Sequence, residues 1–143
     1  LLVAGRNKAL LKKLESLSSN SKLTLKKYGY IDNIEEMMAV ADLMLTKPGG
    51  LTVSEALAVG VPLLMFNPIP YQETNNAAYI SSKGAGVLAT SIKNAIQLIK
   101  KHYASPTHLE KMRENARKIS KPKAAEVIVN TVLEDNRADT SRF

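Results

Sequence analysis

The segment TKPGGLTVSEALAVGVPLLMFNPIP, residues 46–70, contains the turn, the helix and the strand that decide the fold. Its Pro-Gly-Gly turn leads into a short apolar helix, which we predict at Leu51–Val59, and an apolar strand follows at Pro62–Phe66. The preceding strand, predicted at Ala41–Leu45, is also largely apolar. Strands that are apolar on both faces are typical of a parallel sheet covered by helices on each side. The segment therefore predicts an α/β fold.

The same alternation of short apolar runs and helical patterns continues on both sides of this segment. Further strands are predicted at Leu1–Ala4, Leu23–Tyr28 and Gly86–Leu88. Further helices are predicted at Asn7–Ser18, Ile34–Val40, Gln72–Lys83, Ser91–Tyr103, Ser105–Ile119 and Pro122–Glu134. We therefore expect a Rossmann-like parallel sheet with helices on both faces, ending in several helices. We expect one domain over residues 1–135 and a disordered tail over residues 136–143.

The composition is that of a globular domain. The chain has 143 residues, of which 45% are hydrophobic, and this is enough for one domain with a buried core. The absence of cysteine excludes disulfides, Cys-type zinc sites and thiol nucleophiles, and it is consistent with a cytoplasmic location. No apolar run reaches the roughly 18 to 20 residues of a membrane span. Because the first residue is not Met and LLVAG already reads as a buried strand, we expect the chain to begin partway into a longer protein.

The net charge of +7 is concentrated near the C-terminus. Residues 93–143 contain eleven Lys and Arg against six Asp and Glu, which accounts for +5 of the total. A basic region of this kind can dock on an anionic membrane surface or on nucleic acid. It can equally be a set of solvated helix faces, and the sequence leaves these alternatives open.

The glycine turn lies where an open parallel sheet binds ligands, beyond the carboxyl end of a strand and before a helix. Gly49 and Gly50 leave the backbone open to a ligand, and the N–H groups of the following helix suit a pyrophosphate. Thr52 adds a hydroxyl donor. Glu55, expected in the first helical turn, offers two acceptor oxygens that suit the vicinal hydroxyls of a ribose.

A structural explanation of the same residues stands beside this one. Thr52 to Glu55 matches the pattern S/T-x-x-E of a capping box, in which Thr52 caps the helix and Glu55 binds back to the N–H of Thr52. The glycines would then be ordinary turn residues. Spacing alone does not decide between a capped helix and a ligand site.

A second polar loop, FNPIPYQETNNAAY, follows the next strand and therefore emerges at the same edge of the sheet. Its polar residues are Asn67, Gln72, Glu73, Thr74, Asn75 and Asn76. Amides and a carboxylate suit the hydroxyl groups of a sugar, and Pro68 and Pro70 stiffen the loop that carries them. The alternative is a polar loop and helix cap without a ligand. Two such elements at one edge favour a site for a nucleotide diphosphate sugar.

From Tyr28 to Ala89 the sequence resembles the donor-binding, C-terminal half of glycosyltransferases of the GT-B fold. The runs K-P-G-G-L-T-x-S-E-A-L-A-x-G-x-P and N-P-I-P-x-Q-E are similar to those of the processive diacylglycerol glucosyltransferases and monogalactosyldiacylglycerol synthases. The related N-acetylglucosaminyltransferase of peptidoglycan precursor synthesis has a turn closer to S-G-A-L-T-V-S-E and a later loop closer to Q-Q-x-x-N-A. The resemblance therefore favours the glycolipid group and implies an N-terminally truncated donor-binding domain.

The resemblance also implies roles for individual residues in binding a UDP-sugar. Tyr30 and Ile31 match the slot for uracil, and Glu55 matches the glutamate that holds the ribose hydroxyls. The diphosphate would face Gly49, Gly50, Leu51 and Thr52. Gln72 and Glu73 match the pair that contacts the donor hexose, and Asn76 belongs to the same signature and shapes the loop. Glu73 stands where the peptidoglycan enzyme has a second glutamine.

As a whole, the resemblance implies part of an inverting hexosyltransferase that uses a UDP-hexose, no metal and no further cofactor. The family's acceptor site and catalytic base lie in an N-terminal domain, so we assign no catalytic residue here. We expect His102 and His108 to lie at the surface.

The partners expected are the UDP-sugar, a membrane lipid acceptor such as diacylglycerol and an anionic membrane surface, at the cytoplasmic face of the membrane. The alternatives are the peptidoglycan enzyme, a UDP-sugar epimerase of the same fold and, from another class, a basic nucleic-acid-binding domain. We expect no nucleic acid partner because aromatic residues make up only 5% of the chain and no nucleic-acid motif is present.

Overall fold

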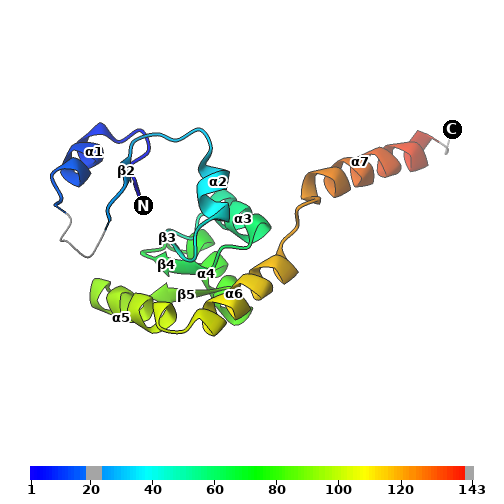
Figure 1. The fold of residues 1–143 in the computed structure, drawn as a ribbon. Helices are drawn as coiled ribbons and strands as arrows, with labels where there is room; N and C mark the ends of the chain where they lie inside the picture. The colour runs from blue at the N-terminus through cyan, green and yellow to red at the C-terminus, as the bar shows by residue number, and fades with distance from the viewer. Residues whose placement is uncertain (19–23, 141–143) are drawn as a thin grey trace. The chain divides into compact units, whose positions relative to one another are not determined.

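A computed structural model describes residues 1–18 and 24–140 (Figure 1). The chain divides into two compact units, Leu1–Met37 and Met38–Phe143. The predicted single domain over residues 1–135 is not tested by this division and stays a prediction. Helix α2, Ile34–Ala39, spans the boundary between them.

The first unit is a short βαβ element. Strand β1, Leu2–Val3, pairs in parallel with β2, Lys27–Tyr28, and helix α1, Lys8–Glu15, lies between them in the chain. Asn7 caps α1, because its side-chain oxygen accepts the N–H of Leu10 at 2.9 Å. The predicted strand over Leu23–Tyr28 is described only from residue 24 and is confirmed at its last two residues.

The second unit contains a parallel sheet of three strands in the order β3-β4-β5. The strands are Met44–Thr46, Leu63–Phe66 and Gly86–Ala89. The crossover helices are α3, Gly50–Val59, and α4, Gln72–Ser82. Leu64 of β4 is paired with Leu45 of β3 and with Val87 of β5. All carboxyl ends therefore lie at one edge of this sheet, and there the glycine turn and the second polar loop begin.

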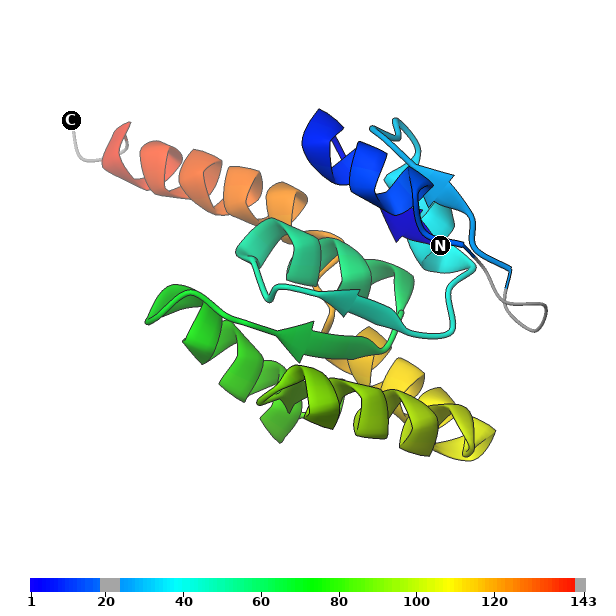
Figure 2. The same cartoon turned by 90° about the vertical axis from the view of Figure 1, so that its left-hand side faces the viewer.

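Helices cover both faces of the three-stranded sheet, as the sequence predicted. Leu64 and Ala89 are buried against Ala95 of α5, Ile92–Tyr103. Side chains alternate along a strand, so Gly86 faces the other side, where a Cβ on it would meet Ile80 of α4. In Figure 2 the yellow-green α5 and the blue-green α3 lie on opposite sides of the strands. The α/β class and the helices on both faces are confirmed, while the strands form two parallel sheets instead of one.

The chain ends in two more helices, α6, Pro106–Ile119, and α7, Ala124–Thr140. Pro106 occupies the first turn of α6, where a missing N–H costs little. Helix α7 extends to Thr140 and so includes residues 136–140 of the expected disordered tail, whose disorder stays a prediction. Residues 141–143 of that predicted tail lie outside the described residues.

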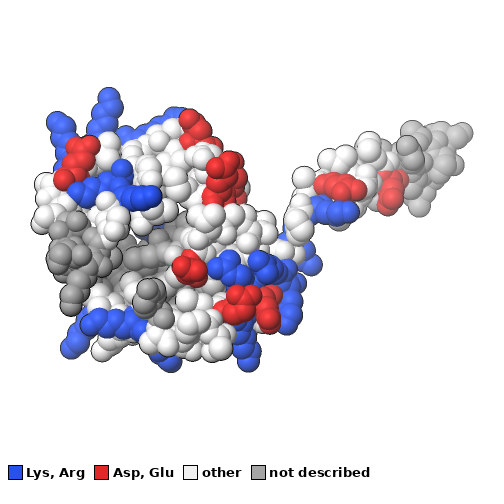
Figure 3. All heavy atoms as spheres, in the orientation of Figure 1, with Lys and Arg blue, Asp and Glu red and all other residues white. Residues whose placement is uncertain are grey.

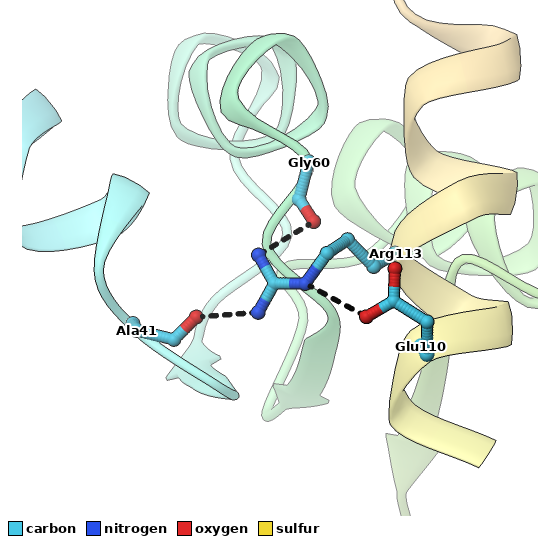
Figure 4. Close-up of polar contacts among 4 residues, drawn as sticks. All are labelled: Ala41, Gly60, Glu110 and Arg113. Carbon is cyan, nitrogen blue, oxygen red and sulfur yellow. Dashed lines mark hydrogen bonds and ion pairs between the residues drawn. The ribbon is translucent and has the colours of Figure 1, made fainter. Parts of the chain in front are cut away.

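Helix α6 fixes the C-terminal end of α3 (Figure 4). The Arg113 guanidinium donates to the carbonyls of Ala41, at 3.0 Å, and Gly60, at 3.5 Å, and it lies 3.7 Å from the carboxylate of Glu110. Gly60 ends α3 with a positive φ of 80°, and a Cβ there would meet the Arg117 side chain at 2.8 Å. The C-terminal end of α3 therefore lies against two arginines of α6.

His102 lies in the core, where the sequence predicted a surface position. Its side chain is only 1% exposed, and its ring centroid is 4.6 Å from that of His108. Neither ring nitrogen of His102 has a hydrogen-bond partner among the described residues. Burial, together with the charges of His108 and Lys101, lowers the pKa of His102. The misplacement has a simple cause: His102 is seven residues after Ala95, on the face of α5 that packs on the sheet.

Candidate functional site

The N-terminal end of α3 presents free backbone donors. Gly49 is the N-cap residue in extended conformation (φ −66°, ψ 143°), and its carbonyl accepts the N–H of Val53 at 2.9 Å. The N–H groups of Gly50, Leu51 and Thr52 have no acceptor among the residues that the structure describes. Unpaired N–H groups and the positive end of the helix dipole together favour an anion such as a phosphate. This end of α3 is therefore a candidate anion site.

The capping box that the sequence left open is not formed. Thr52 is the third residue of α3 instead of its cap, and no side chain caps the helix. The placement of Glu55 in the first turn is also wrong. Because the extended Gly49 lets the helix begin at Gly50, Glu55 is the sixth residue and lies in the second turn. Its exposed carboxylate has no hydrogen bond or ion pair within the described part of the chain, so it is available as an acceptor.

The loop between β4 and α4 is held in an unusual conformation. Asn67 has a φ of 50°, and Tyr71, the N-cap residue of α4, has φ 72° and ψ −89°. A positive φ is uncommon for a bulky residue such as tyrosine, and strained backbone of this kind concentrates at functional sites. Nothing in the sequence indicated this role of Tyr71, because the type of a residue does not reveal its backbone φ.

Glu73 fixes this loop through one of its two oxygens. Its Oε2 accepts the N–H of Ile69 at 2.7 Å, and the hydroxyl of Thr74 donates to the carbonyl of Ile69 at 3.3 Å. The second oxygen, Oε1, points toward the glycine turn, since a Cβ placed on Gly49 would lie 3.7 Å from it. Glu73 thus has a structural hydrogen bond on one side and a free acceptor on the other.

The two loops that the sequence singled out meet in the structure. The Asn76 side chain donates from Nδ2 to the carbonyl of Pro48 at 3.0 Å and so joins α4 to the turn before α3. A Cβ on Gly50 would lie 4.0 Å from Nε2 of Gln72, so this amide also reaches the start of α3. Gly49, Gly50, Gln72, Glu73 and Asn76 therefore form one cluster.

Helix α3 separates Glu55 from the α4 side of this cluster. Glu55 is five residues after Gly50, which corresponds to about 140° around an α-helix. Gly50 and Leu57 face α4, and with Asn76 and Tyr79 they line a pocket of about 220 Å³. The free N–H groups of α3 therefore lie between the Glu55 carboxylate on one side and the polar side chains of α4 on the other.

Tyr30 and Ile31 belong to the first unit and are described within it. The Tyr30 ring is exposed, and the guanidinium carbon of Arg6 lies 4.6 Å from its centroid, which is a cation–π contact. Ile31 is half-buried. Their predicted role at the uracil base is not tested by these contacts and stays a prediction.

Two classes of feature are missing from residues 1–18 and 24–140. No three His, Asp or Glu side chains gather there as a metal site would need. No helix within these residues has both the length and the apolar character required to span a bilayer.

The comparisons with known proteins identify the family of this chain. Residues 1–128 match the model of the glycosyltransferase family 28 C-terminal domain. A processive diacylglycerol beta-glucosyltransferase of Bacillus cytotoxicus is 39% identical over 140 residues, 98% of this chain and 36% of that protein. The protein of the same name from Bacillus thuringiensis is 36% identical over 143 residues, all of this chain and 37% of that protein. The chain thus spans little more than a third of the length of these curated relatives.

Among solved structures, the fold is similar to that of MurG from Acinetobacter baumannii, with a TM-score of 0.75. The match covers 94% of this chain and 41% of MurG at 20% identity, so it supports the fold alone. Since the family model covers nearly the whole described sequence, the chain belongs to glycosyltransferase family 28 and contains its C-terminal domain.

Proposed function

We propose that this chain is the donor-binding part of a UDP-sugar-dependent, inverting glycosyltransferase that transfers a hexose to a membrane lipid such as diacylglycerol. The observation that carries the proposal is the set of three free N–H groups at the start of α3, which lie between Glu55 and the Gln72–Glu73 pair. The names of the relatives, which match over almost the whole chain, support the lipid acceptor.

In this proposal the diphosphate lies against Gly49, Gly50, Leu51 and Thr52. The N–H groups and the dipole of α3 offset the negative charge that develops as UDP leaves. Because these donors are already fixed in the helix, they need no reorganisation during the reaction. An acceptor hydroxyl attacks the anomeric carbon from the opposite side, which inverts its configuration, and the base that takes its proton lies outside this chain.

The remaining contacts place the two ends of the donor. Glu55 accepts hydrogen bonds from the ribose hydroxyls, and the free oxygen of Glu73 and the amide of Gln72 bind hydroxyls of the hexose. Asn76 acts through the turn, since it holds the Pro48 carbonyl. Tyr30 and Ile31 supply the contacts to uracil. No part of this scheme requires a bound cofactor.

The proposal is tested by following the backbone amides by NMR during titration with UDP. Resonances of Gly49 to Glu55 should shift, even at millimolar affinity, and UMP should shift them less because it lacks the second phosphate. Glu55→Ala should weaken the response, whereas Glu114→Ala, a matched change at an exposed glutamate of α6, should not. A response that is equal in both variants, or that avoids α3, would contradict the proposed site.

The acceptor is tested separately, with the longer protein that contains this chain. Transfer to diacylglycerol, and none to a lipid-linked muramoyl acceptor, is the expected result. The opposite preference would assign the chain to the peptidoglycan reaction instead.

A further inference from the structure

Helix α5 carries a line of exposed isoleucines. Ile92 is 70% exposed, Ile96 49% and Ile99 38%. They follow one another at intervals of four and three residues, so they lie on one face of the helix. This set, Ile92, Ile96 and Ile99, is called the isoleucine stripe below.

The stripe is fixed in an outward position by the packing of α5. Ala95 and His102 are buried on the face of the helix that adjoins the stripe, and Leu98 packs against the same core cluster. The start of the helix is held by two reciprocal bonds: the Asn94 N–H donates to the Ser91 hydroxyl, and Oδ1 of Asn94 accepts the Thr90 N–H, both at 3.1 Å. The isoleucines therefore cannot be buried by rotating α5 without breaking this core.

The surroundings of the stripe are basic. Lys93 and Lys100 each follow a stripe isoleucine by one residue, which places them about 100° around the helix, and Lys101 is also exposed. No Asp or Glu occurs between residues 74 and 109. In Figure 3 the lower left edge, where α5 lies, shows blue Lys and Arg atoms and no red ones.

We propose that α5 docks on the surface of an anionic lipid bilayer. An interfacial helix buries an apolar stripe at the boundary between headgroups and acyl chains, while flanking lysines reach anionic headgroups. The isoleucine stripe and the lysines meet both requirements on one helix. The docking surface goes beyond the donor site. Its link to a lipid acceptor rests on the proposed function, but the surface itself does not.

Docking is measured by sedimenting the chain with vesicles of phosphatidylcholine alone or mixed with phosphatidylglycerol. Binding should require the anionic lipid and weaken as salt is added, since salt screens the lysines. The assay contains no UDP-sugar, and the UDP titration contains no lipid. Failure of one proposal is therefore distinguishable from failure of the other.

Variants of the stripe and of the lysines separate the two contributions. Ile92→Ser with Ile96→Ser should lower vesicle binding about tenfold or more, because the apolar contact is lost. Val40→Ser, at another exposed apolar residue, is the control. Lys93→Gln with Lys100→Gln should lower binding by about five-fold per lysine. The matched control is Lys111→Gln with Lys118→Gln, which removes the same charge at the same seven-residue spacing from α6.

The absence of cysteine allows a direct measurement of depth. A polarity-sensitive fluorophore on Ile96→Cys should shift to the blue when anionic vesicles are added, and the same label on Val40→Cys should not. This readout does not depend on the serine variants folding normally.

Three results would overturn the proposal. The first is vesicle binding that the α6 pair abolishes and the α5 variants leave intact. The second is a label at position 96 that stays in water on bound vesicles. The third is a chain that ignores vesicles but forms a dimer that Ile92→Ser with Ile96→Ser disrupts, because the stripe would then be an interface between copies.

Discussion

The two ends of helix α3 differ in how their backbone groups are satisfied. At the C-terminal end, the Gly60 N–H binds the carbonyls of Ala56 and Leu57, and the Gly60 carbonyl accepts from Arg113. At the N-terminal end, three N–H groups have no acceptor among the described residues, and two glycines leave them uncovered. The first N–H groups of any helix lack intrahelical partners, and here they lie beside a strained loop, which fits the donor site proposed above. The closed, C-terminal end is held by the fold, and the open, N-terminal end is where we propose that the donor binds.

Gly60→Val should have the largest effect of the changes at the closed, C-terminal end of α3. A β-branched residue at φ 80° is strained, and its Cβ would also displace the Arg117 side chain. We expect the free energy of unfolding to fall by about 3 kcal/mol, as measured by urea denaturation. Gly60→Asn is the control, because asparagine tolerates positive φ and should cost clearly less. Equal losses in both variants would show that contact with Arg117, and not backbone strain, dominates.

Arg113→Ala tests the same end with a smaller effect. It leaves the carbonyls of Ala41 and Gly60 without their donor in a partly buried place, so we expect a loss of about 1–3 kcal/mol in urea denaturation. Lys111→Ala, on an exposed position of the same helix, should be nearly neutral. UDP affinity of the folded fraction should not change, and a large change would mean that the two ends are coupled through α3.

Gly50→Ala should weaken ligand binding at the open, N-terminal end of α3 without destabilising the fold. A Cβ there meets nothing closer than 4.0 Å, and alanine is the better helix former, so stability should stay the same or rise by up to about 1 kcal/mol. The methyl group would occupy the approach to the N–H groups, and we expect UDP affinity to fall about tenfold, or about 1.4 kcal/mol. Calorimetry or NMR titration measures it. An unchanged affinity would place the anion elsewhere.

The smallest effect we expect is a pH dependence of the free energy of unfolding. The pKa of His102 is lowered by burial and then by His108 and Lys101. Below about pH 6.5, the usual pKa of histidine, the unfolded chain therefore takes up a proton that the folded chain does not. The free energy of unfolding falls as the pH decreases through this range and stops falling below the pKa of folded His102. His102→Leu should reduce the difference between the free energies of unfolding that urea denaturation gives above and below pH 6.5. His108→Gln should reduce this difference less.

The sequence predicted the elements well because their signals are local. Apolar runs such as Leu63–Phe66 have one reasonable structure when helical patterns lie on both sides, and the glycine turn marks where α3 must begin. The boundaries were less certain. The helix could begin before or after Thr52, and only the observed start at Gly50 removed the capping box and moved Glu55 to the second turn.

The contacts between elements were not predictable from such local signals. The bond from Asn76 to Pro48 joins residues that are 28 positions apart. Nothing in the sequence indicates that Arg113 of α6 reaches Ala41, 72 positions away. His102 was misplaced because its polar character suggested the surface, whereas its position on α5 put it in the core. In these cases tertiary packing, and not the type of the residue, determined where the side chain lies.

Because one oxygen of Glu73 accepts the Ile69 N–H, the second group of this side chain determines whether it accepts or donates a hydrogen bond toward the glycine turn. A carboxylate that accepts from Ile69 with Oε2 offers a second acceptor, Oε1, toward the glycine turn. A glutamine that kept the bond to Ile69 would have to use its only oxygen there, and it would then present an NH₂ donor instead. Exchange of one side chain at position 73 would therefore reverse donor and acceptor for a bound hydroxyl without moving the backbone.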